Sequence, residues 1–126
     1  MPAIAIALTL VVVLLGQPSA PTLAVPVLMA GLGPCSADFT VTGLSGEPVY
    51  GALIHVRVRY GFWSIKRADL EVGTNSEGRA RIEGLPGKAK PLLYDIRKDI
   101  LTSEAEQKVA DTCQARFAVS LNEANP

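Results

Sequence analysis

The stretch GTNSEGRARIEGLPG, residues 73–87, is the most patterned part of the chain. Turn-forming residues come first, and charged and apolar residues then alternate. The oxygen-bearing side chains resemble those of a calcium loop, but Gly73 and Gly84 stand where that loop needs acidic ligands. We therefore predict a turn between two strands, in which Gly78 has left-handed backbone and Asn75 bonds the nearby main chain.

The predicted turn sets a register for the two strands beside it. If they form a hairpin, three cross-strand pairs follow: Val72 with Ala80, Leu70 with Ile82, and Glu71 with Arg81. Apolar side chains then meet on one face, and an acid meets a base on the other.

Apolar residues alternate with polar ones along most of the chain from residue 38 onward, which is typical of half-buried β-strands. The segments with this period are residues 38–43, 51–61, 68–73, 80–86, 91–101 and 113–121. Residues 102–111 are polar, and we expect one helical turn or a long loop there. About seven short strands separated by turn signals predict an all-β, antiparallel sandwich or barrel.

The first 37 residues of the chain contain no charged side chain. The 12 basic and 12 acidic side chains cancel, so no net field favours nucleic acid or an anionic membrane as a partner. The first of them is Asp38, and residues 2–15 are almost wholly apolar. That length fits a signal peptide better than a membrane span. We predict a signal peptide over 1–24, or an uncleaved anchor that would make the membrane a partner.

The remaining boundaries follow from this leader. We expect a linker over 25–37, a sandwich domain over 38–121 and a tail over 122–126. The chain has two cysteines, Cys35 and Cys113, and an exported chain favours a disulfide between them. A disulfide that closes a loop of almost 80 residues, as between these two cysteines, stabilises a fold by about 4 kcal/mol. Lipidation of Cys35 is disfavoured by the proline before it. The predicted location is secreted, periplasmic or in the cell envelope.

The strand over 51–61 has a basic face made of His55, Arg57 and Arg59. These side chains form either a binding surface for an anionic ligand or one side of a charge-paired sheet. A hairpin through GFWSIK places Arg59 opposite Asp69, and Arg57 opposite Glu71, with Arg81 in a third column. Exposed pairs of this kind contribute little stability.

Three aromatic residues, Tyr60, Phe62 and Trp63, gather at the end of the same strand. They either fold back onto the core or present a stacking surface to a sugar ring or a protein. We take this segment, together with the basic face, as the candidate binding site.

The sequence offers little evidence for a catalytic or a metal-binding motif. His55 is the one histidine, no serine lies in a Gly-x-Ser-x-Gly turn, and a metal site lacks ligands. We therefore predict neither a metal nor another cofactor, and a protein that is not an enzyme.

The order GLSGEPVYGALIHVRV, TNSEGRARIEGLPG and PLLYDIRK resembles the carboxypeptidase regulatory-like domains over residues 38–121. The matching pieces are turn and core residues. The resemblance implies an Ig-like, transthyretin-like sandwich and a non-catalytic structural or binding module, whose partner is an unidentified envelope protein or glycan. Transthyretin-like folds also include a hydrolase with several histidines, but this chain has one and ends LNEANP instead of carrying that enzyme's terminal motif. Fold alone does not settle function.

Overall fold

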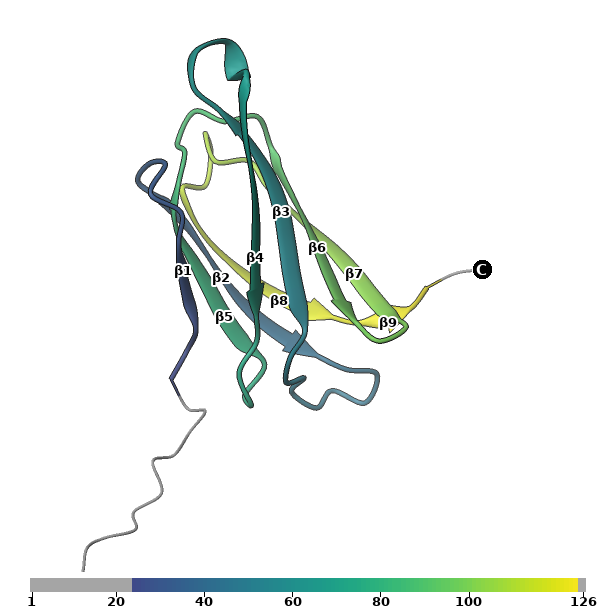
Figure 1. Ribbon diagram of the computed structural model, residues 1–126. Coiled ribbons are helices and arrows are strands. Elements are labelled where there is room, and N and C mark those ends of the chain that lie inside the picture. The colour runs from purple at the N-terminus through teal and green to yellow at the C-terminus, as the bar shows by residue number, and fades with distance from the viewer. Residues whose placement is uncertain (1–23, 125–126) are drawn as a thin grey trace, which may run out of the picture.

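The computed structural model describes residues 24–124, and these form two β-sheets with the core between them (Figure 1). The predicted all-β architecture is confirmed for this range, where a single turn of 3-10 helix, η1 (Phe62–Ser64), interrupts the strands. No helix within it is long and apolar enough to cross a membrane. The predicted signal peptide or anchor lies outside the described residues except for Ala24.

The smaller sheet contains parallel as well as antiparallel neighbours. Its order is β1 (Val27–Met29), β5 (Arg79–Leu85), β2 (Cys35–Thr42) and β8 (Gln114–Ser120). β1 runs parallel to β5, and β2 runs parallel to β8, so the prediction of a purely antiparallel sandwich is wrong here. Alternation along a strand determines which side chains are buried, but it does not specify the direction of the neighbouring strand.

The larger sheet is antiparallel throughout. Its order is β4 (Lys66–Gly73), β3 (Leu53–Tyr60), β6 (Leu92–Lys98), β7 (Leu101–Gln107) and β9 (Asn122–Glu123). β7 falls in the segment for which the sequence predicted a helical turn or a loop. Its inward residues include Ser103 and Ala105, opposite Ile96 and Tyr94, so the apolar alternation is weak. Pairing with β6 imposes the extended conformation.

The connection over 74–78 joins the two sheets, which corrects the predicted hairpin. β4 pairs with β3, whereas β5 pairs with β2 and β1. None of the three predicted pairs forms, because Val72, Leu70 and Glu71 lie in one sheet and their expected partners in the other. The same alternation of apolar and polar residues occurs whether the next strand joins the same sheet or crosses to the facing sheet.

The local prediction for this connection is confirmed. Gly78 has φ 76°. The Asn75 side-chain oxygen accepts hydrogen bonds from the main-chain N–H groups of Glu77 and Arg79, both at 2.9 Å. Thr74 is buried; its hydroxyl donates to the carbonyl of Val49 at 2.6 Å and accepts from another main-chain N–H at 2.9 Å. The polar side chains of this connection satisfy the backbone where the chain crosses between sheets.

Three aromatic rings form the centre of the core. The ring of Phe39 contacts those of Tyr94 and Phe117, at centroid distances of 4.8 and 5.3 Å. The Tyr94 hydroxyl donates to the side-chain oxygen of Gln107 at 2.6 Å, and the Gln107 amide donates to the carbonyl of Ser36 at 3.1 Å. Burial raises the pKa of Tyr94 far above its usual value, so its hydroxyl stays a hydrogen-bond donor.

The predicted disulfide between Cys35 and Cys113 is confirmed. It lies next to the Ser36–Gln114 pair at the start of the parallel strands β2 and β8, which the chain brings together over a separation of 78 residues. An oxidised pair is consistent with an extracellular or periplasmic location. β1 and the first residues of β2 lie within the range expected to be a linker, and β9 lies within the range expected to be a tail.

Candidate functional site

The outer face of the larger sheet carries the basic residues of β3. Ile54, Val56 and Val58 of this strand are fully buried, so the residues between them point outward. The structure therefore places His55, Arg57 and Arg59 side by side on one face, between strands β4 and β6.

The partners of these residues on β4 differ from the predicted ones by two positions. Arg57 lies opposite Asp69 and Arg59 opposite Arg67, so the predicted pair of Arg59 with Asp69 is wrong. The predicted pair of Arg57 with Glu71 is likewise wrong, since His55 faces Glu71. The ladder extends to Tyr60 and Lys66, which makes the turn shorter than expected. Sequence alternation does not specify the length of a turn.

Arg81, expected in a third column, lies on β5 in the other sheet. Its guanidinium donates to Asp38 at 2.5 Å and to Glu83 at 2.7 Å. The hydrogen bond to Glu83 has the largest effect on the pKa of Arg81, followed by the one to Asp38, and both raise that pKa. The Arg81 guanidinium is therefore paired within the smaller sheet and does not contribute to the basic face of the larger sheet.

Asp69 links two of the basic side chains on the outer face. Its Oδ1 accepts a hydrogen bond from Arg57 Nε at 3.1 Å and lies 3.4 Å from His55 Nε2. The hydrogen bond from Arg57 is the main reason why the pKa of Asp69 lies below its usual value. Because all three side chains are solvated, the link orients them without adding much stability.

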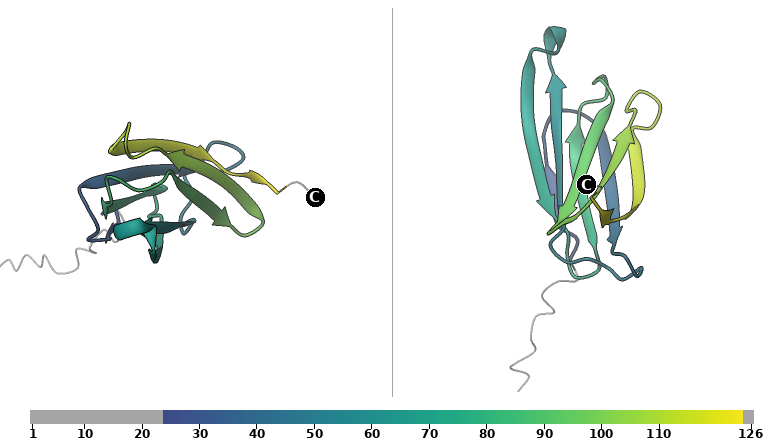
Figure 2. Two further views of the ribbon diagram at one scale, coloured as in Figure 1. Left: turned by 90° about the horizontal axis from the view of Figure 1, so that it is seen from above. Right: turned by 90° about the vertical axis from the view of Figure 1, so that its right-hand side faces the viewer.

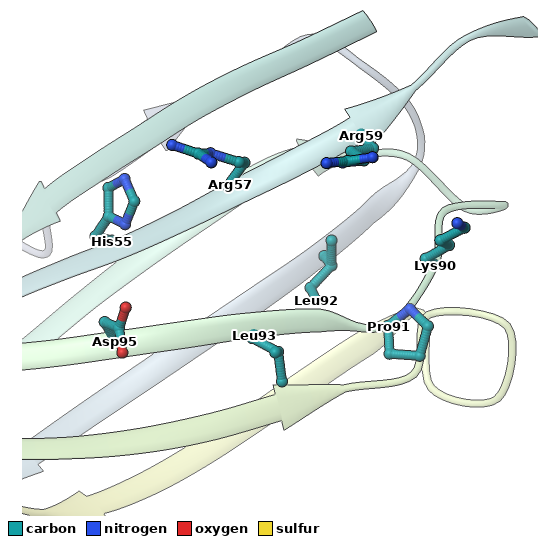
Figure 3. Close-up of a pocket in the computed structure, with 8 residues that line it drawn as sticks. All are labelled: His55, Arg57, Arg59, Lys90, Pro91, Leu92, Leu93 and Asp95. Carbon is teal, nitrogen blue, oxygen red and sulfur yellow. The ribbon is translucent and has the colours of Figure 1, made fainter. Parts of the chain in front are cut away.

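A hollow of about 480 Å³ opens on this face between β3 and β6 (Figure 3). Its basic side is His55, Arg57, Arg59 and Lys90; its apolar side is Pro91, Leu92 and Leu93, with Asp95 at one end. Among the residues that the structure describes, neither Arg59 nor Lys90 has an ion-pair partner. Two cations therefore remain available beside an apolar wall.

A second hollow, of about 340 Å³, adjoins the first. Leu53, His55, Glu71, Asp95 and Arg97 line it, so the two hollows share His55 and Asp95. His55 therefore lies beside carboxylates as well as cations.

Lys90, Leu93 and Asp95 were missed by sequence reasoning. They lie on β6 or just before it, and they reach the site because β6 pairs with β3. The alternation in PLLYDIRK predicts that Leu93 and Asp95 share a face, but no local signal indicates which strand lies beside them.

The aromatic residues form a separate feature at the end of the β3–β4 hairpin. We call residues 61–65 the aromatic tip. Phe62, Trp63 and Ile65 are 78, 81 and 73% exposed, so these side chains do not fold back onto the core. Tyr60 is half-buried and packs against the core. The candidate residues thus divide between the hollow and the tip.

The described residues do not fit a metal site. Within residues 24–124 no group of three His, Cys, Asp or Glu side chains is placed to bind an ion. Catalytic metal sites commonly use two or more histidine ligands, and this chain has one histidine.

No family model matches the chain, and no curated protein is similar to it in sequence. Solved structures do match the fold. Catechol 1,2-dioxygenase from Pseudomonas arvilla C-1 matches with a TM-score of 0.53 and 11% identity over 83% of this chain. The chain spans 60% of that protein. The dioxygenase domain of a dioxygenase carbohydrate-binding protein fusion from Streptomyces sp. SirexAA-E matches with a TM-score of 0.50 and 14% identity, over 84% of this chain and 85% of that one.

These matches correct the prediction of a non-enzymatic module. Both of these solved structures, which share the sandwich fold, are dioxygenases. The chain lacks the usual catalytic motifs, and at 11 to 14% identity its sequence does not reveal this structural likeness. At such low identity the matches show the fold alone.

Proposed function

We propose that the chain is an enzyme that acts on a small anionic molecule held in the hollow between β3 and β6. The observation that carries the proposal is the pair of cations, Arg59 and Lys90, without ion-pair partners among the described residues, beside His55. Cations that are already paired, such as Arg81, offer less to a ligand. A carboxylate or phosphate group is the ligand chemistry that suits them.

The rest of the hollow selects for a molecule with an apolar part. Leu93 is 65% exposed although it is a large apolar residue, and Pro91 lies beside it in Figure 3. A ring or short aliphatic chain placed there removes apolar surface from water while its anionic group faces Arg59 and Lys90. The volume is that of a small-molecule site.

His55 is the group that we expect to transfer a proton. Histidine is the side chain that exchanges protons near neutral pH. Asp69 lies 3.4 Å from its Nε2 and is held ionised by Arg57, so it orients the imidazole. In the proposed step, His55 removes a proton next to a carbonyl of the bound anion, and the cations stabilise the negative charge that develops.

The reaction for which the structural neighbours are named does not suit the residues of this chain. Those proteins are named for a dioxygenase reaction on catechol, whereas the described residues here do not fit a metal site. Acid–base chemistry needs only groups that this face contains.

Pyruvate in deuterated buffer tests both parts of the proposal. We expect saturable shifts of the His55 imidazole signals in NMR titrations, and exchange of the pyruvate methyl protons for deuterium above the buffer rate. His55→Gln should retain binding and lower the exchange rate by about 100-fold or more. Arg59→Gln combined with Lys90→Gln should weaken binding. Arg116→Gln, an exposed cation on the other sheet, is the matched control and should behave as wild type.

Absence of saturable shifts would overturn the anion site. Binding without His55-dependent exchange would overturn the enzymatic role while leaving the site in place.

We further propose that the domain is exported and has the Ig-like, transthyretin-like topology of the carboxypeptidase regulatory-like domains. The two-sheet architecture and the disulfide support this proposal. Mass spectrometry of the protein from its native host is the test. A mature N-terminus near Val25 supports cleavage, whereas an intact Met1 in the membrane fraction supports the anchor. The predicted envelope partner stays a prediction.

A further inference from the structure

The aromatic tip projects beyond the rest of the molecule. In Figure 1 and Figure 2 the β3–β4 hairpin extends past the other connections at its end of the sandwich. Its large side chains, Phe62, Trp63 and Ile65, are all more than 70% exposed. Clustered apolar groups on a protrusion cost free energy in water and mark an interaction surface.

The backbone of the tip holds these side chains outward. Trp63 has φ 65°, a left-handed conformation that is strained for a bulky residue. Its ring packs edge-to-face on that of Phe62, with centroids 5.3 Å apart. The two rings form one small wedge that makes no contact with the sandwich core.

The charges near the tip are almost entirely basic. β3 and β7 end here, and β4 and β6 begin here, so the tip lies at the same end as the connections over 86–91 and 108–113. The basic residues of these segments and the hairpin end are Arg59, Lys66, Arg67, Lys88, Lys90 and Lys108, against the acidic residue Asp111.

The opposite end of the sandwich has a more even mixture of charges. Its connections cover residues 43–52, 74–78 and 99–100, and the short strand β9 (Asn122–Glu123) lies beside them. Acidic residues there are Glu47, Glu77, Asp99 and Glu123, and basic residues at the adjoining strand ends are Arg79, Arg97 and Lys98. The marked excess of basic side chains is therefore at the tip end.

We propose that the aromatic tip inserts into the surface of a lipid bilayer that carries anionic headgroups. An apolar wedge surrounded by basic side chains is the arrangement that binds such surfaces, with the rings at the acyl boundary and the cations among the headgroups. A tryptophan ring is suited to that depth. The opposite end of the sandwich then faces away from the membrane.

A lipid surface fits the tip better than a protein partner does. A stable protein interface needs about 800 Å² on each side, and a wedge of three side chains on a narrow hairpin offers a small, convex area. A bilayer interface takes up a convex group without a complementary pocket. A protein partner and a second copy of this chain are the alternatives that the experiment must separate.

Trp63 is the chain's one tryptophan, so its fluorescence reports directly on the tip. The test uses vesicles of phosphatidylcholine alone and of an equal mixture with phosphatidylglycerol. We expect a blue shift of the emission and co-sedimentation with the mixed vesicles, both reduced by high salt, and little of either with phosphatidylcholine alone. An unchanged spectrum with the mixed vesicles would overturn the proposal.

Variants separate insertion from general electrostatic attraction. Phe62→Ser with Ile65→Ser keeps the reporter and should abolish the blue shift. Lys66→Glu with Arg67→Glu should lower the partition coefficient about tenfold or more. The matched control is Arg79→Glu with Lys98→Glu, which changes net charge equally but away from the tip, and it should partition more strongly than the tip variant.

Equal losses in the two charge variants would overturn the proposed orientation. Sedimentation velocity on the free protein gives a second criterion. Self-association that is removed by the Phe62 and Ile65 substitutions, without vesicle binding, would assign the tip to a second copy instead. Neither tip variant alters His55 or Arg57, so failure here leaves the proposed enzyme site unaffected.

Discussion

The two connections at the ends of β4 have opposite characters. The connection over 74–78 is rich in polar residues, yet Thr74 and Asn75 are each 4% exposed and hydrogen-bonded to the main chain. The aromatic tip before β4 is apolar, yet Phe62 and Trp63 are among the most exposed large side chains of the described residues.

This contrast shows how burial distinguishes structural from functional loops. Buried polar groups with every hydrogen bond satisfied hold the backbone in place, and removing one leaves an unpaired partner. A cluster of exposed apolar groups contributes little to the fold and marks an interaction surface. The connection that resembled a ligand loop in the sequence is structural, and the tip is the better candidate for recognition.

The largest expected effect concerns the disulfide, which closes the same end of the sandwich as the tip. Replacing both Cys35 and Cys113 by Ser should lower the free energy of unfolding by about 4 kcal/mol, measured by urea denaturation. Wild-type protein in reductant is the control and should show a matching loss. A loss below about 1 kcal/mol would mean that other contacts hold this end together.

The next effect tests the crossing connection. Gly78→Ala should lower the free energy of unfolding by about 3 kcal/mol. The left-handed backbone is strained for alanine, and the new Cβ would collide with the Val41 carbonyl oxygen. Gly46→Ala is the matched control: Gly46 has φ 82° with open space around it, so about 1 kcal/mol is expected. Thermal and urea denaturation measure both, and equal losses would contradict the role of the close approach.

The third largest effect is expected for Asn75→Ala, which should lower the free energy of unfolding by about 2 kcal/mol. The substitution removes two hydrogen bonds to its side-chain oxygen and one from its amide to the carbonyl of Ala24 at 3.1 Å. Asn122→Ala removes an exposed amide and should stay within about 0.5 kcal/mol. A near-neutral Asn75→Ala in urea denaturation would remove the distinction between the two connections.

The smallest effect is expected at the tip itself. Trp63→Ser should change the free energy of unfolding by less than about 0.5 kcal/mol, since the side chain is 81% exposed. Phe39→Ala, in the core, should cost about 4 kcal/mol when measured in the same way. A loss above about 1 kcal/mol for Trp63→Ser would mean that the tip has a structural role.

The candidate site was only partly predictable. The alternation in β3 predicts that His55, Arg57 and Arg59 share an outer face, because side chains in a strand alternate strictly. Asp95 lies on β6 and Lys90 just before it, and the shared hollow exists because two strands about 40 residues apart pair. The exposure of Trp63 likewise depends on how far the hairpin extends beyond the sandwich.

By itself, the sequence determined the β class, the Cys35–Cys113 disulfide and the local conformation at Gly78, because each depends on short-range alternation, on a simple pairing choice or on one residue's backbone preference. Only the tertiary structure decided that β4 and β5 belong to different sheets and that two strand pairs are parallel. It also gathered six basic side chains, against one acidic side chain, in the segments around the aromatic tip. The physical reason is that alternation determines which face of a strand is buried, whereas its neighbours are chosen by long-range contacts that close the core.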